Sequence, residues 1–127
     1  MAEAIPDLWP DIEQSQVTPP VAILREQAAA LGRKTNYLLN GRVFTRTEGT
    51  RFIHEFEIIA PALDDYSYKL FSIEHGPDPY PVVVPTRPAV APIGSETELI
   101  GFVRDVLNSE KTKKVVGSLL AQVKAMR

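Results

Sequence analysis

The chain has no cysteine, and this absence excludes disulfide bridges and metal sites built on thiolates. A cysteine-free chain fits a reducing cytosol, so we expect a cytoplasmic protein. No stretch approaches the roughly 20 consecutive apolar residues that a membrane helix needs. The first ten residues have neither a basic start nor a long apolar run, so we also expect no signal peptide and no membrane partner.

Several catalytic and nucleotide-binding motifs are also missing. The sequence has no Gly-x-Ser-x-Gly elbow, no Gly-x-Gly dinucleotide loop and no phosphate loop ending in Gly-Lys-Ser/Thr. No acidic residue is followed two positions later by lysine, so a nuclease core with a Glu-x-Lys element is not supported. These absences favour a protein that is not an enzyme, with no catalytic residue, no resident metal and no cofactor.

What is present is the composition of one ordinary globular domain. The chain has 127 residues, of which 44% are hydrophobic and 24% are charged, and it is long enough to bury a core. Its net charge of −2 is distributed in blocks, since residues 1–20 hold four acids and no base whereas residues 21–50 hold five bases and two acids. Alternating blocks argue against a continuous basic stripe, so we expect no nucleic-acid partner.

Residues 1–18 are predicted to form an extended acidic arm, and residues 19–127 a single α+β domain. The arm contains the large apolar residues Leu8, Trp9 and Ile12. Because such side chains are costly to leave in water, we favour their packing on the chain's own domain. The alternative is that they form a short linear motif for a partner.

The predicted order of elements in the domain is α-β-β-β-β-α-α, with the strands forming an antiparallel four-stranded meander. Thr18 and the two prolines after it mark the start of the first helix, which is predicted to end near Asn36. Ser95, with Glu98 three residues later, and Ser109 are predicted to cap the two C-terminal helices. The predicted strands occupy residues 37–47, 50–59, 66–75 and 80–84.

Alternation in the first two strands predicts a sheet covered on both faces. With Glu48 and Gly49 as the hairpin loop, Val43 would lie opposite His54, on the face that the C-terminal helices cover. The opposite face carries Phe44 and Ile53, and it needs the first helix, the arm or a second subunit as cover. We therefore predict an interface that includes Phe44, Ile53 and Trp9.

Prolines mark the fourth predicted strand as an edge strand. Pro77, Pro79, Pro81 and Pro85 all have odd numbers, so their missing N–H donors lie along one side of an extended chain. Only the outer strand of a sheet tolerates such a side, which predicts an edge position.

The only two histidines raise the question of a ligand site. A hairpin centred near Asp64 and Asp65 would bring His54 close to Glu74 and His75, and two imidazoles with a carboxylate form a reasonable zinc or iron set. We favour a simpler interpretation, in which His54 is a partly buried histidine satisfied by a backbone carbonyl or by Glu74. The candidate ligand-binding residues are His54, Glu74, His75, Tyr66 and Tyr68.

Three arginines on the first hairpin, Arg42, Arg46 and Arg51, form a candidate anion-binding group. The acidic block in residues 51–80 lies next to them in the sequence and opposes the binding of an anion.

Two functions of different classes remain from the sequence. The favoured one is a non-catalytic interaction or regulatory module, such as an adaptor, an immunity-type inhibitor or a small regulatory subunit, with a protein partner or a second copy of itself. The alternative is a small enzyme or ligand- or metal-binding protein with a site around His54, Glu74 and His75.

Overall fold

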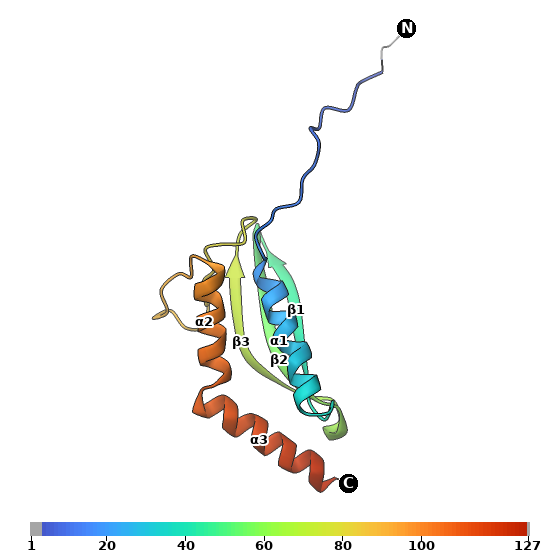
Figure 1. Cartoon of the computed structure of the whole chain (residues 1–127), viewed down its shortest axis with the longest axis vertical. Helices are drawn as coiled ribbons and strands as arrows, with labels where there is room; N and C mark the ends of the chain where they lie inside the picture. Colours follow the sequence, from blue (N-terminus) through green and yellow to red (C-terminus); the bar gives the residue numbers. More distant parts are fainter. Residues whose placement is uncertain (1–3, 127) are drawn as a thin grey trace.

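The computed structural model describes residues 4–126, which form three α-helices and one antiparallel sheet with the strand order β1-β2-β3 (Figure 1). The α+β class is as predicted, but the four-stranded sheet is wrong because the sheet has three strands. The first three residues of the predicted arm and the last residue of the predicted domain lie outside the described residues. The elements are α1 (Pro20–Lys34), β1 (Asn40–Glu48), β2 (Arg51–Ala60), the 3-10 helix η1 (Pro61–Leu63), β3 (Tyr66–His75), α2 (Glu96–Leu107) and α3 (Glu110–Ala125).

The predicted fourth strand is absent because its prolines face β3. Val83 exchanges two backbone hydrogen bonds of 2.8 Å with Glu74 of β3. In an antiparallel ladder the next bonds toward β3 come from residues two positions away, but these are Pro81 and Pro85, which have no N–H. The segment therefore forms only one bridge to β3, at Val83. On its other side, Val82 forms a bridge to Ile93. The prediction placed the missing donors on the outer edge, whereas they lie on the inner one.

The β1–β2 hairpin turns at Gly49 and Thr50, one residue later than predicted. Gly49 has a φ of 58°, a left-handed conformation that glycine adopts without steric cost. Thr45 consequently lies opposite His54, where the prediction placed Val43. A shift of two residues preserves which side chains share a face, so the faces were predicted correctly although the register was not.

A bulge in β3 decides which residue neighbours His54. The β2–β3 connection contains η1 and two consecutive aspartates with φ values of 57° and 52°. The pairing between β2 and β3 is interrupted between Phe56 and Glu57 of β2, where β3 has one extra residue. One extra residue exchanges the two faces of a strand. The bulge therefore puts His75, and not Glu74, on the same face as His54.

All three helices cover one face of the sheet (Figure 1). Gly41 of β1 lies so close to α1 that an added Cβ would be 2.4 Å from the Cα atom of Ala28. Phe56 shares a core cluster with Leu99 of α2, and Ile58 belongs to a neighbouring cluster that includes residues of α3. The C-terminal helices thus cover the predicted face. Helix α1 joins them there, so none of the helices in residues 4–126 covers the opposite face, which we call the open face.

The two C-terminal helices begin at the predicted caps. The Ser95 side chain accepts a hydrogen bond from the backbone N–H of Glu98, and Ser109 accepts one from the N–H of Thr112, both at 3.2 Å. Each such cap stabilises its helix by about 1 kcal/mol. Helix α1 has no side-chain cap at its start. Within residues 4–126, no helix combines the length and the apolar character needed to cross a membrane.

The N-terminal arm, residues 4–19, forms no helix or strand and leads away from the domain (Figure 1). The exposed fractions of Leu8, Trp9 and Ile12 are 82%, 77% and 76%. The prediction that these side chains pack on their own domain is therefore wrong. Thr18 and Pro19 each precede a proline, which restricts both residues to extended backbone.

Candidate functional site

Two buried histidines, His54 of β2 and His75 of β3, are neighbours on the helix-covered face. Their exposed fractions are 4% and 8%. Their Nε2 atoms are 2.9 Å apart and their ring centroids 5.0 Å apart. The two rings are diagonal neighbours, because the residue directly opposite His54 on β3 is Ile73. We call these two residues the histidine pair.

The partners of the outer ring nitrogens determine where the two protons of the histidine pair lie. His75 Nδ1 is 2.6 Å from the carbonyl oxygen of Gly76 and 3.2 Å from that of Asp78. A carbonyl only accepts, so this nitrogen donates, and the neutral ring of His75 then accepts at Nε2 from His54. The Nδ1 atom of His54 accepts from the Thr45 hydroxyl at 2.8 Å. All four ring nitrogens have partners while both rings are neutral.

Burial keeps the His54 ring neutral at pH 7. Loss of solvation lowers the pKa of His54 from 6.5 to about 4, and the nearby His75 and Arg25 act in the same direction. His54 is thus buried and hydrogen-bonded, where the sequence predicted a partly buried histidine. Its partners are Thr45 and His75, whereas we had expected a backbone carbonyl or Glu74.

The other members of the candidate ligand set lie away from the histidine pair. Glu74 is on the open face, where its carboxylate pairs with Arg51 at 3.3 Å. Tyr66 and Tyr68 lie at the opposite end of β3 from His75. Among residues 4–126, no group of three or more histidine, aspartate, glutamate or cysteine side chains is placed to hold a metal ion. Of the five candidate ligand-binding residues, the structure therefore brings His54 and His75 into contact with each other and leaves the other three away from them.

The three arginines of the candidate anion group lie on the open face, and each one is paired with a carboxylate. The carboxylates offset the positive charge that would attract an anion to the guanidinium groups. The arrangement is therefore a ladder of ion pairs across the sheet. The pairs are Arg42–Glu57 (2.5 Å), Arg46–Glu55 (3.7 Å) and Arg51–Glu74 (3.3 Å).

The two predicted interface residues of the sheet differ in exposure. Phe44 has an exposed fraction of 53%, whereas that of Ile53 is only 4%. Ile53 lies between Arg46 on β1 and Glu74 on β3, whose side chains belong to the ion pairs of the open face. This face therefore presents one half-exposed aromatic ring among charged groups.

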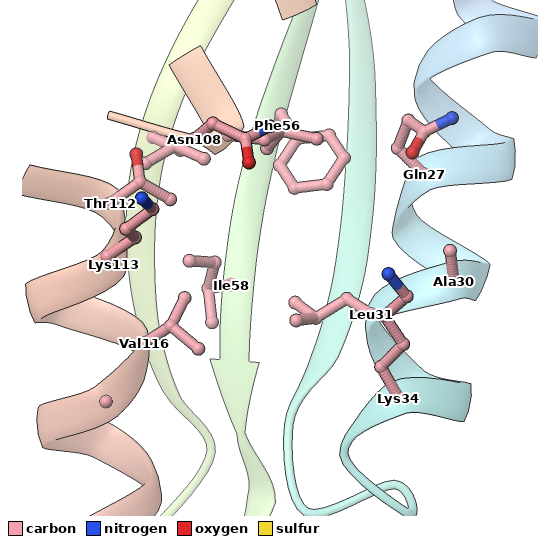
Figure 2. Close-up of a pocket in the computed structure, with 13 residues that line it drawn as sticks. Gln27, Ala30, Leu31, Lys34, Phe56, Ile58, Asn108, Thr112, Lys113 and Val116 are labelled. Atoms are coloured by element: carbon pink, nitrogen blue, oxygen red, sulfur yellow. The ribbon is translucent and has the colours of Figure 1, made fainter. Parts of the chain in front are cut away.

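A groove of about 480 Å³ lies between α1 and the α2–α3 segment (Figure 2). Its floor is the sheet, with Phe56, Ile58 and Leu70, and its walls include Leu31 of α1 and Val116 of α3. This volume is in the usual range for binding sites. Sequence reasoning missed the groove, because periodicity identifies the apolar face of each helix but not the space left between two helices on one sheet.

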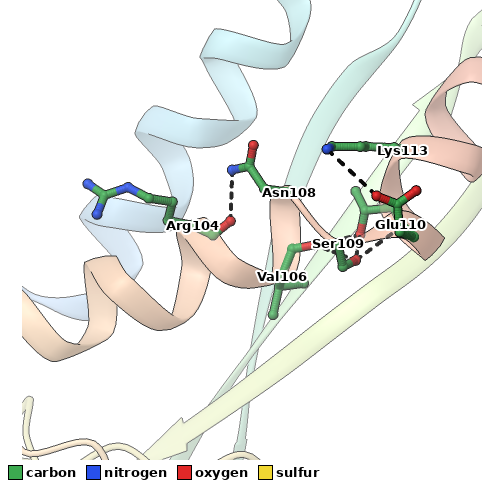
Figure 3. Close-up of polar contacts among 7 residues, drawn as sticks. Arg104, Val106, Asn108, Ser109, Glu110 and Lys113 are labelled. Carbon is green, nitrogen blue, oxygen red and sulfur yellow. Dashed lines mark hydrogen bonds and ion pairs between the residues drawn. The ribbon is translucent and has the colours of Figure 1, made fainter.

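The α2–α3 junction sets the position of one groove wall. The Asn108 side-chain amide donates to the backbone carbonyl of Arg104 at 2.8 Å (Figure 3). The Thr112 hydroxyl donates to the carbonyl of Val106 at 2.7 Å. The first bond closes the last turn of α2, and the second holds the end of α2 against the start of α3. Asn108, Thr112 and Lys113 then line the groove.

The groove also has a positive rim. Lys34 belongs to α1 and Lys113 to α3, on opposite sides of the groove (Figure 2). None of the thirteen residues that line the groove is acidic. The groove therefore combines an apolar floor with a lysine at each wall, and the ammonium of Lys113 is 3.9 Å from the carboxylate of Glu110 (Figure 3).

Comparison with known proteins assigns no family to the chain, since no family model, no curated protein and no solved structure matches it.

Proposed function

We propose that this chain is a non-catalytic protein-interaction module and that the N-terminal arm is its contact segment. The observation that carries the proposal is the exposure of Leu8, Trp9 and Ile12, which ranges from 76% to 82%. Fully burying each of these side chains would contribute roughly 1.5–3 kcal/mol. Three large apolar groups within five residues therefore form a segment that gains stability when a partner covers it.

Local hydrogen bonds in the arm support the same proposal. The Asp7 carboxylate accepts from the backbone N–H of Trp9 at 3.0 Å, and the Ser15 hydroxyl accepts from the N–H of Val17 at 3.2 Å. Such short-range bonds restrict an extended segment before it meets a partner, which lowers the entropy cost of binding. They suit the short linear motif of an adaptor or small regulatory subunit.

The alternative function, a ligand or metal site at the histidine pair, has less support. Glu74 lies on the other face of the sheet, and each outer nitrogen of the pair already has a hydrogen-bond partner. A ligand would have to replace buried, satisfied hydrogen bonds, which is costly.

Site-specific photo-crosslinking in cells that produce the protein tests the proposed function. A photoreactive phenylalanine analogue replaces Leu8 in the arm, and the same analogue replaces Tyr37 in a control chain, because Tyr37 is also exposed but lies in the domain. We expect a discrete adduct of the Leu8 chain with a protein, whether another copy or a different chain. If the Leu8 chain gives no protein adduct above the level of the Tyr37 chain, the proposal is wrong.

A further inference from the structure

We propose that the groove between α1 and α3 binds the N-terminal arm of a second copy of this chain, so that two copies exchange arms. The inference rests on the proposed function and names the partner of the arm. It is carried by the match between the chemistry of the arm and that of the groove.

The apolar residues of the arm match the apolar floor of the groove. Leu8, Trp9 and Ile12 are, with Ile5 and Val17, the exposed large apolar residues of the arm. The groove of about 480 Å³ has room for part of such a segment, and the partly exposed apolar side chains that the segment would cover are Leu31, Leu70 and Val116. Docking would remove apolar surface from water on both sides of the contact.

The charges of the two surfaces are complementary. Asp7, Asp11 and Glu13 alternate with the apolar residues of the arm, and residues 1–20 contain no base. The groove carries Lys34 and Lys113 on opposite walls and has no acidic lining residue. An acidic segment seated on the floor thus has a cation on either side. Like charges would exclude a basic segment from the same position.

The start of α1 favours exchange between copies over binding of the arm to its own groove. The lining residues of α1 run from Gln27 to Lys34, in the second half of the helix. Pro19 has an extended backbone with a ψ of 149° and precedes Pro20, and the arm leads away from α1 at the end opposite to these lining residues (Figure 1). An arm that leads away from its own groove is placed to enter the groove of a neighbour. Two such contacts form a closed twofold dimer.

Trp9 supplies the test, because it is the only tryptophan of the chain. Its fluorescence in the full-length protein reports whether the arm is in water or in an apolar groove. We expect a blue shift of the emission that grows with protein concentration. Sedimentation should show a monomer becoming a dimer over the same concentrations, and added salt should weaken both changes.

A substitution inside the groove with a matched control connects the dimer to this site. Gly117 of α3 lines the groove, and Gly101 of α2 does not. An added Cβ meets nothing within 4 Å at either position, so both helices accept a side chain there. Gly117→Glu should weaken dimerisation about tenfold or more, because it places a negative charge where the acidic arm binds. Gly101→Glu should leave dimerisation unchanged.

Each other outcome overturns the inference in a recognisable way. A monomer with blue-shifted Trp9 at every concentration means that the arm binds its own groove. A dimer that persists in Gly117→Glu uses another surface. A monomer with Trp9 in water excludes the second copy as occupant, and a Leu8 adduct with a different protein would then leave the proposed function standing.

Discussion

His54 donates a hydrogen bond from Nε2 to the Nε2 atom of His75 over 2.9 Å, in a core where His54 is 4% exposed. The bond depends on the bulge that puts both rings on one face of the sheet. It also depends on the register that gives His54 a hydroxyl partner in Thr45. A proton added to His54 would place a charge in this buried setting, so the stability contributed by His54 depends on pH.

Acid is expected to destabilise the fold through His54. Its folded pKa of about 4 lies below the value of 6.5 in an unfolded chain, so the unfolded state takes up the proton first. The contribution of the neutral ring to stability is fully present above pH 6.5 and falls by about 3 kcal/mol as the pH decreases to 4. We expect the free energy of unfolding of the wild type, measured with urea, to exceed that of His54→Gln by less at pH 4 than at pH 7. Parallel curves for the two proteins would contradict the prediction.

Zinc is expected not to stabilise the protein. The histidine pair has no third ligand within residues 4–126, and the Nδ1 atom of His75 donates its proton to backbone carbonyls. Metal binding needs ring nitrogens with free lone pairs and would have to break these bonds. The melting temperature should therefore be the same with and without an equimolar amount of zinc. A rise that disappears in His75→Gln would restore the metal-site interpretation.

Gly41→Ala is expected to destabilise the protein by about 1–3 kcal/mol or more, because the new Cβ would meet the Cα atom of Ala28 in α1. Gly117→Ala is the matched control, since its Cβ enters open space in the middle of α3. The control should gain about 0.5–1 kcal/mol from helix propensity. Chemical denaturation of the two variants measures both effects. If Gly41→Ala were as stable as the wild type, α1 would not pack closely on β1.

Phe44→Asp is expected to give a folded protein that loses about 1–2 kcal/mol of stability, since Phe44 is half exposed on the open face and the new carboxylate lies opposite Glu55. Its association state should equal that of the wild type, because the arm and groove are unchanged. Circular dichroism measures whether the variant is folded, and sedimentation measures its association state. A variant that is folded but dissociated, while the wild type is dimeric, would show that the open face is the interface. An unfolded chain would assign Phe44 to the core.

Local sequence determined the parts of the fold that depend on neighbours a few residues apart. Ser95 and Ser109 cap their helices because the N–H group that each one binds is three residues away. Alternation also assigned Val43 and Phe56 correctly to one face of the hairpin, because the side chains of an extended chain alternate with a period of two. These features follow from backbone geometry and need no knowledge of distant contacts.

Tertiary structure decided where those elements meet. The turn at Gly49 set the partner of His54, and the bulge in β3 chose His75 over Glu74 as its neighbour. Gly41, which lets α1 approach the sheet, explains why that helix joins the other two on one face and leaves a groove between them. Each of these outcomes depends on small free-energy differences between alternative registers and packings. Contacts between residues far apart in the chain determine those differences, and local periodicity does not record them.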